Sequence, residues 1–175
     1  MGSCFPYNHP RAQEIVDFVK KVHKALGYTD GATHVEVMIG LQGQLEIIDF
    51  NPRFIGADVM QSINHAFGVR IQDALLELAQ GKRPTSPFTQ KQVSCIQYVL
   101  CPPVDRFESI EFPKDAEVVF STSFIKPGSV MKRFDKQLDY VGCYLTVMPT
   151  VQEALKRSYE LRSKVIINGG LNGVY

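Results

Sequence analysis

The stretch HVEVMIGLQGQLEIIDFNPR carries acidic residues in two neighbouring apolar segments, 33–39 and 45–50. Both segments alternate β-branched or apolar residues with polar ones, a pattern typical of strands. Gln42-Gly43 stands between them, and a glycine at this point can supply the positive φ that a tight turn needs. The stretch therefore predicts an antiparallel hairpin, which Pro52 ends.

A two-residue loop at Gln42-Gly43 places Glu36 directly opposite Asp49. The same register pairs His34 with Asn51 and Met38 with Ile47, and alternation predicts an apolar face of Val35, Val37, Ile39, Ile48 and Phe50. Opposed carboxylates about 5 Å apart repel each other, so a compensating group is expected. A shared proton, a cation such as Arg53, or a divalent metal held by carboxylate and amide oxygens would each serve, and a solvated face that tolerates the acids is the alternative.

Composition limits the classes of protein to consider. The 175 residues are 45% hydrophobic, enough for one domain or two small ones, and a formal charge of +1 gives no reason to expect nucleic acid or an anionic membrane as a partner. No apolar run approaches the roughly 20 residues of a membrane span. The isolated cysteines, without a C-x-x-C pair, favour reduced thiols and a cytoplasmic location. Residues 1–3 are interpreted as the remnant of an expression tag.

Helical periodicity surrounds the hairpin. Apolar residues three and four apart predict a helix from Pro10 to Gly27, a helix from Asp58, as its cap, to about Phe67, and a helix from about Arg70 to Gly81. His9, His23 and His65 lie on these helices or their ends and are expected to have surface or packing roles. The Pro- and hydroxyl-rich segment after Gly81 is the linker candidate, which gives domains 4–82 and 91–175 joined by residues 83–90.

The later part reads as a small α+β unit. Strands are expected at about 93–100, 117–125 and 140–147, with turns at Pro102-Pro103 and Pro127-Gly128. Thr150 and Glu153 form a capping box that opens a helix, with Val151, Ala154, Leu155 and Leu161 facing inward, before a short strand at 165–167. Lys132-Arg133 and Lys156-Arg157 are interpreted as solvated charges, and Cys101 as a packed thiol.

The residues also resemble a known superfamily. T-H-V-E at 33–36, a hairpin, and I-I-D-F-N-P-R at 47–53 followed by Gly56 resemble the end of an ATP-grasp domain, found in ATP-dependent ligases. A-Q-G at 79–81 matches the end of that domain's apolar helix. G-A-T-H-x-E at 31–36 is most similar to the L-amino acid ligase branch. The resemblance implies an α+β fold: the C-terminal half of an ATP-grasp domain, with antiparallel strands and helices, plus a small α+β C-terminal domain.

The resemblance implies ATP and Mg²⁺, or Mn²⁺, as cofactors, and an enzyme that joins a carboxylate to an amine through an acyl phosphate. Glu36, Asp49 and Asn51 would be the metal and nucleotide ligands, and Arg53 the catalytic cation that neutralises the transferring phosphoryl group. His34 and Gly56 are candidate substrate contacts. Two departures from the pattern are Asp49, where the family usually has Glu, and Ile55-Gly56 in place of Gly-Gly.

The family's adenine- and phosphate-binding strands would precede residue 5, so the expected partner is a missing N-terminal portion of the same polypeptide, without which the fragment should be inactive. Small carboxylate and amine substrates are the other expected partners, and a homodimer is left open. Two alternative interpretations remain: a biotin-carboxylase-like fragment that activates bicarbonate, and a non-catalytic interaction module whose paired acids hold a proton or an arginine.

Overall fold

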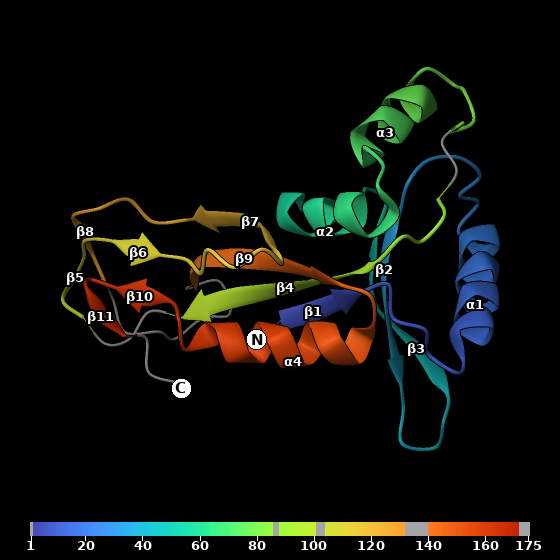
Figure 1. Ribbon diagram of the computed structural model, residues 1–175. Helices are drawn as coiled ribbons and strands as arrows, with labels where there is room; N and C mark the ends of the chain where they lie inside the picture. Colours follow the sequence, from blue (N-terminus) through green and yellow to red (C-terminus); the bar gives the residue numbers. More distant parts are fainter. Residues whose placement is uncertain (1, 86–87, 101–103, 132–139, 172–175) are drawn as a thin grey trace. The chain divides into compact units, whose positions relative to one another are not determined.

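The computed structural model describes residues 2–85, 88–100, 104–131 and 140–171 (Figure 1). The helices are α1 (Ala12–Ala25), α2 (Ala57–Phe67), α3 (Ile71–Ala79) and α4 (Val151–Arg162). The longer strands are β1 (Gly2–Phe5), β2 (His34–Ile39), β3 (Leu45–Asn51), β4 (Val93–Leu100), β7 (Val118–Ser123) and β9 (Tyr140–Met148). The short strands are β5 (Arg106–Phe107), β6 (Ile110–Glu111), β8 (Ser129–Val130), β10 (Ile166–Ile167) and β11 (Gly170–Leu171). The predicted α+β class is confirmed.

Contacts along the chain define two compact units. The hairpin unit comprises residues 7–60 and 69–88, and the sheet unit comprises residues up to 6, 61–68 and from 89 onward. The chain passes between the units several times. Within the predicted linker, residues 83–85 and 88–90 form neither helix nor strand. No helix in the described ranges is both long and apolar enough to cross a membrane.

The sheet unit is built on an antiparallel sheet of strand order β1-β4-β9-β7. β4 and β9 are buried along most of their length, as expected of central strands covered on both faces. One face packs against α4 (Figure 1). On α2, the hydroxyl of Ser62 donates a buried hydrogen bond to Ser94 Oγ on β4, at 2.9 Å.

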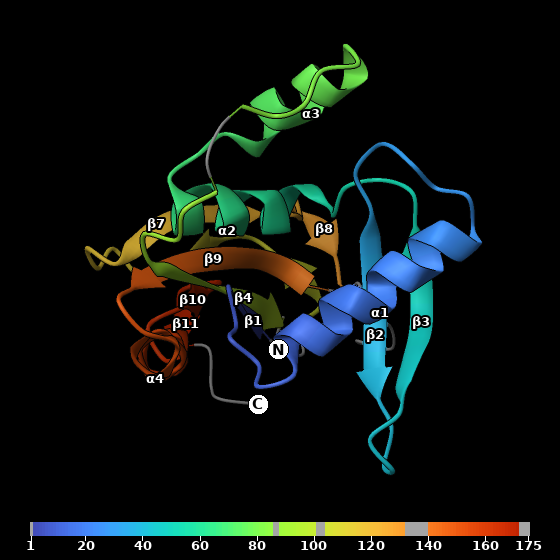
Figure 2. The ribbon, with the colours of Figure 1, turned by 90° about the vertical axis from the view of Figure 1, so that its right-hand side faces the viewer.

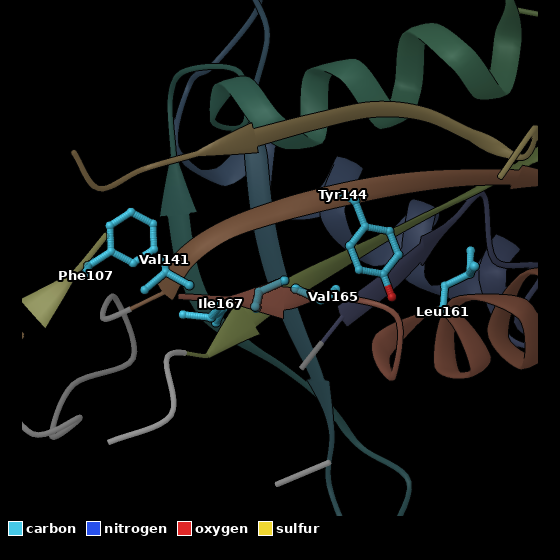
Figure 3. Packing of buried hydrophobic residues seen from close by; sticks show 7 residues of the cluster. Phe107, Val141, Tyr144, Leu161, Val165 and Ile167 are labelled. Atoms are coloured by element: carbon cyan, nitrogen blue, oxygen red, sulfur yellow. The ribbon is translucent and has the colours of Figure 1, made fainter. Parts of the chain in front are cut away.

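An apolar cluster fills the space between this sheet and α4. Its buried members are Val99, Phe107, Val141, Tyr144, Leu161, Val165 and Ile167, most of them labelled in Figure 3. The hydroxyl of Tyr144 donates to the backbone carbonyl of Ser158, at 2.7 Å, so the one polar group of this ring is satisfied. Burial raises the pKa of Tyr144 to about 12, against the smaller opposing effect of that hydrogen bond.

The capping residues of α4 confirm the predicted helix start. The backbone N–H of Glu153 donates to Thr150 Oγ1 at 3.2 Å, and the Thr150 hydroxyl donates to the Glu153 carboxylate at 2.8 Å. The inward position predicted for Leu155 is wrong, because this side chain is 53% exposed. The buried stripe instead follows Ala154, Ser158 and Leu161 at spacings of four and three, which leaves Leu155 about 100° away around the helix.

The start of the chain differs from what the sequence led us to expect. Residues 2 and 3, set aside with residue 1 as a tag remnant, are part of β1, which pairs with β4. Cys4 lies directly opposite Cys95 in that pairing, and the two form a disulfide instead of the expected reduced thiols. The register brings together two residues that are 91 positions apart, which sequence spacing alone does not indicate. Cys101, predicted to be a packed thiol, lies outside the described residues, as do Pro102-Pro103 and Lys132-Arg133.

Within the hairpin unit, α1 lies beside the β2–β3 hairpin (Figure 2). Both α1 and α3 end as their glycines predict. Gly27 has φ +67° and Gly81 has φ +71°, values that favour glycine, and the residue after each donates its N–H to a carbonyl five positions earlier. These are Schellman ends, which satisfy the last carbonyls of each helix and turn the chain sharply.

Candidate functional site

The β2–β3 hairpin brings the predicted acids together. Glu36 is opposite Asp49, and His34 is opposite Asn51, as the sequence predicts. The predicted pairing of Met38 with Ile47 is wrong, since Met38 faces Glu46. Register is shifted by one position between Glu36 and Val37, so the hairpin consists of two regular halves separated by a β-bulge.

The loop explains why a bulge is present. The backbone N–H of Gly40 donates to the Gln44 carbonyl, and the N–H of Gly43 donates to the Gly40 carbonyl, each at 2.8 Å. Three residues, Leu41 to Gly43, therefore form the loop instead of the predicted two, with Gly43 at φ +84°. An odd loop shifts the register by one residue, and the extra residue in β3, Ile48, restores it before the acids are reached.

The bulge also changes which apolar residues face α1. Ile48 was predicted to lie on the apolar face, but its side chain is 59% exposed. Ile47, predicted to share the face with the acids, is partly buried, as are Leu45 and Phe50. The alternation predicted for β3 is therefore wrong for the residues before Asp49. Two consecutive residues, Ile48 and Asp49, are both exposed at the bulge.

The two carboxylates of the site are open to solvent. Glu36 and Asp49 are exposed, and the side-chain N–H of Asn51 donates to Asp49 Oδ2 at 2.5 Å. This contact orients the Asn51 amide so that its carbonyl oxygen remains available as an acceptor. The face thus presents two carboxylates and one amide oxygen, an arrangement dominated by oxygen donors.

Arg53 does not neutralise the acids within the described part of the chain. Its Nη1 donates to the backbone carbonyl of Phe54, at 3.0 Å, and the side chain is exposed. No ion pair joins Arg53 to Glu36 or Asp49 among the described contacts. The guanidinium keeps further N–H donors for an anionic ligand.

The candidate substrate residues lie at the start of β2 and in the loop that follows β3. His34 begins β2 and is partly buried. Gly56 lies in the loop before α2, and an ideal Cβ built there meets no heavy atom within 4 Å, so the space beside its backbone is open. Asp58 was predicted to cap α2 but lies inside its first turn, where burial raises the pKa of its carboxyl.

The donor set fits a hard divalent cation. Carboxylate and amide oxygens are the ligands that Mg²⁺ and Mn²⁺ prefer, and Mg²⁺ commonly binds through one or two carboxylates plus waters and phosphate oxygens. No group of three or more His, Cys, Asp or Glu side chains that could enclose a metal occurs in the ranges that the structure describes. Glu36, Asp49 and Asn51 would therefore supply part of a coordination shell, completed by a phosphate ligand.

A second set of residues supports the face from behind, and the sequence reasoning missed its role. His23 Nε2 and Thr33 Oγ1 share a hydrogen bond of 3.0 Å, and the His23 ring packs edge-on against Phe50 with centroids 5.5 Å apart. The packing role expected for His23 agrees with this environment. The sequence shows a hydroxyl residue, Thr33, directly before His34. Its hydrogen-bond partner, His23, is ten residues earlier, so no local pattern links the two.

No profile of a known protein family matches the chain. Its sequence is 33% identical over 76 residues to the alanine–anticapsin ligase of Bacillus amyloliquefaciens, a match that covers 43% of this chain and 16% of the relative. The chain thus spans about a sixth of this curated relative, so the similarity concerns one part of a longer enzyme.

Solved structures resemble nearly the whole chain. An L-amino acid ligase from Bacillus licheniformis superposes with a TM-score of 0.80 at 18% identity, over 95% of this chain and 43% of that one. Phosphoribosylglycinamide synthetase from Anaerococcus prevotii gives 0.78 at 17%, over 95% and 44%. The biotin carboxylase domain of the Hydrogenobacter thermophilus 2-oxoglutarate carboxylase, in complex with MgADP and bicarbonate, gives 0.68 at 16%, over 96% and 39%.

These likenesses show that the chain has the fold of ATP-grasp enzymes, the class that its sequence motifs predict. The curated relative and the first of these structures are both ligases of amino acids, which agrees with the predicted branch. The chain spans less than half of each of the three structures.

Proposed function

We propose that this chain is the C-terminal part of an ATP-dependent carboxylate-amine ligase, which forms an amide or peptide bond through an acyl phosphate. The observation that carries the proposal is the open face on which Glu36, Asp49 and Asn51 converge, with Arg53 two residues further on, in a chain of ATP-grasp fold. The remaining portion of the polypeptide would hold the adenine, and the isolated part would be inactive.

Each residue has a role in this chemistry. Phosphoryl transfer to a carboxylate brings two anions together, so positioning and charge neutralisation dominate catalysis. Glu36, Asp49 and Asn51 would hold Mg²⁺ or Mn²⁺, which when bound supplies positive charge at the ATP phosphates. Arg53, exposed and permanently charged, would stabilise the transferring phosphoryl group and the acyl phosphate.

The second step is the attack of an amine on the acyl phosphate. The C–N bond forms as the C–O bond to phosphate breaks, and the amine loses a proton. His34 and Gly56 would contact the substrates, because His34 lies opposite Asn51 at the end of the face and Gly56, in the loop that follows β3, leaves space beside its backbone. The identity of the carboxylate and the amine belongs to a pocket shared with the rest of the enzyme.

A Mn²⁺ titration of the chain at pH 7 tests the site, read by calorimetry and by the paramagnetic resonance signal of free Mn²⁺. We expect weak binding that Glu36→Gln abolishes. Glu46→Gln is the matched control, because Glu46 is an exposed acid of the same hairpin that faces Met38. Equal binding by wild type and Glu36→Gln would contradict the proposed ligand set and favour a non-catalytic module.

A second candidate is activation of bicarbonate, supported by the likeness to the biotin carboxylase domain. Assays of the full-length parent separate the two. ADP release that requires a carboxylate and an amino acid supports the ligase, whereas ADP release that requires bicarbonate and biotin supports the carboxylase. Arg53→Gln in the parent should lower kcat for either reaction, since both pass through a phosphorylated carboxylate or carbonate.

A further inference from the structure

The face that carries the acids has a defined support on its other side. Phe50 is the direct partner of Val35, and this pair lies between the pairs His34–Asn51 and Glu36–Asp49. Because successive side chains of a strand point to opposite faces, Phe50 lies directly behind the two pairs that make up the candidate site. Whatever holds Phe50 therefore holds both strands of the site.

Phe50 is held by two rings from the end of α1 and the segment after it. The His23 ring meets it edge-on at 5.5 Å between centroids, the Tyr28 ring meets it edge-on at 6.0 Å, and His23 and Tyr28 contact each other at 5.6 Å. Such edge-to-face contacts stabilise a specific orientation of the rings in addition to burying apolar area. Together the three rings form a cluster, which we call the aromatic support.

Hydrogen bonds join the aromatic support to the start of β2. His23 bonds the hydroxyl of Thr33, the residue before His34, at 3.0 Å. The Tyr28 hydroxyl donates to the carbonyl of Ala32, at 3.2 Å, and so closes the turn that leads into the strand. Gly31, at φ +117°, lies against that hydroxyl, where a Cβ would collide with it. The two residues before β2, Ala32 and Thr33, are thus held by hydrogen bonds from Tyr28 and with His23.

Among the described residues, no aromatic contact of this kind reaches the tip of the hairpin. Between the first turns of α1 and the tip lies an open cavity of about 620 Å³, lined by Glu14, Asp17, Phe18, Lys21, Gly43, Gln44 and Leu45. Leu41, the first residue of the loop, is fully exposed. The bulge at Ile48 separates this tip from the half that carries the acids. The aromatic support therefore contacts the half of the hairpin that carries the acids and not the half that carries the tip.

We infer that His23, Tyr28 and Thr33 are positioning residues for the proposed metal-nucleotide site: they fix the separation of Glu36 and Asp49 through Phe50 and the start of β2. This inference rests on the proposed function for the identity of the ligand. The claim that these residues fix the positions of Glu36 and Asp49 does not depend on that function. Mg²⁺ tolerates little variation in the position of its ligands, so loss of the support should weaken binding even though no ligand is removed.

Thr33→Val tests the inference with little change of shape, because it replaces one hydroxyl by a methyl group. We expect Mn²⁺ affinity to fall about fivefold, the equivalent of one ordinary hydrogen bond. Thr33→Ser, which keeps the hydroxyl, should restore it. Thr29→Val is the matched control, since Thr29 lies exposed in the same connecting segment. Failure of serine to restore binding, or an equal loss in the control, would overturn the inference.

Hydrogen exchange of backbone amides supplies a readout that does not depend on metal. In Thr33→Val and in Tyr28→Phe, amides of residues 34–36 and 49–51 should exchange about fivefold faster, while those of 37–39 and 45–47 keep their wild-type rates. A uniform change over both halves, or none, would show that the support does not act on the site. Local acceleration in a protein that binds no Mn²⁺, either alone or with ATP, would keep the positioning inference and count against the metal site.

Discussion

Glu36 and Asp49 illustrate a conflict between stability and function within one residue pair. Opposed acids weaken a strand pair, and the structure offers them the Asn51 amide but no arginine within the described contacts. Residues kept in an unfavourable arrangement often serve a ligand that relieves it. The pair is therefore expected to destabilise the chain in the absence of metal and to stabilise it when metal binds.

The first prediction concerns this repulsion. Glu36→Gln should raise the free energy of unfolding by about 0.2–1 kcal/mol at pH 7 and low salt, because it removes one of two like charges. Urea denaturation measures the change, and the gain should shrink in 1 M salt, where the charges are screened. Glu46→Gln should show no such salt-dependent gain. A stability loss in Glu36→Gln would mean that the two acids already share a favourable contact.

The second prediction concerns Tyr144. Its pKa of about 12 lies above the ordinary value of 10.0, so the folded state favours the neutral phenol. The corresponding stability is fully present below pH 10 and is lost as the pH rises from 10 towards 12, because only the unfolded chain ionises in that window. Tyr144→Phe should cost about 1 kcal/mol at pH 7 through the lost hydrogen bond to Ser158.

Thermal melts from pH 8 to 11.5 would measure both effects. The wild-type protein should lose stability above pH 10 more steeply than Tyr144→Phe. Parallel curves for the two proteins would contradict the assignment of the alkaline loss to this phenol. Tyr159→Phe serves as the control, since that ring is 61% exposed on α4.

At the scale of elements, α4 is tied to the segment before β7 by an ion-pair network that the sequence did not indicate. Asp115 accepts from Lys164 Nζ at 2.6 Å and from Arg157 Nη2 at 2.7 Å, and Arg157 also pairs with Glu117 and Glu160. Arg157 was interpreted as an ordinary solvated charge, and that interpretation is wrong, because Arg157 forms ion pairs with Asp115 and Glu117. Nothing in the sequence indicated these pairs, since both acids lie about forty residues earlier in the chain.

The third prediction concerns Asp115. The hydrogen bond from Lys164, with the charge of Arg157, lowers the pKa of the Asp115 carboxyl below its ordinary value of 3.8. The stabilisation is therefore present above pH 3.8 and is lost as the pH falls through the lower folded value. Asp115→Asn should lower Tm at pH 7, and the difference from wild type should vanish in acid.

The matched control for this network is Glu160→Gln, which removes the outer partner of Arg157 at 3.3 Å and the long contact with Lys156 at 4.0 Å. Its effect on Tm should be smaller, since Glu160 is exposed and lies one helical turn from Arg157. A difference between Asp115→Asn and wild type that persists unchanged at pH 2 would indicate a packing effect instead of a charge effect.

Elements with strong local signals were predicted well. The glycines at the ends of α1 and α3 and the Thr150 cap of α4 each act over a few residues, and they agree with the structure. The alternation predicted for β2 holds for Val35, Glu36 and Val37 but is wrong at Ile39, which is exposed. The acid pair was predicted correctly although the loop length was wrong, because the third loop residue and the bulge at Ile48 cancel each other. A bulge has no reliable sequence pattern, so its effect on Ile47 and Ile48 was missed.

At the scale of the whole chain, the disulfide between Cys4 and Cys95 links two residues that are 91 positions apart. It encloses the intervening residues, which include the whole hairpin unit, in one covalent loop. Periodicity identifies strands one at a time and does not show which strands pair. β4 was therefore predicted at about 93–100, but β1 and its pairing with β4 were not. The order of β4, β9 and β7 has the same origin.

The fourth prediction concerns this disulfide. Reduction with dithiothreitol should lower the free energy of unfolding by about 2–4 kcal/mol, since the open chain gains conformational freedom when it unfolds. Urea denaturation with and without reductant measures the loss, and mass spectrometry reports the state of the thiols. The double variant Cys4→Ala/Cys95→Ala should be insensitive to reductant. Equal stability of the oxidised and reduced wild type would contradict the prediction.

The bulge at Ile48 has a consequence for how this hairpin can vary among related sequences. The tip beyond it can gain or lose residues in matched pairs, one from each strand, and Glu36 will still meet Asp49. A single insertion at the tip would rotate one acid to the buried side, unless a compensating deletion removed Ile48. Relatives with a two-residue tip and a hairpin of the same length should have no bulge, so loop length and bulge would change together.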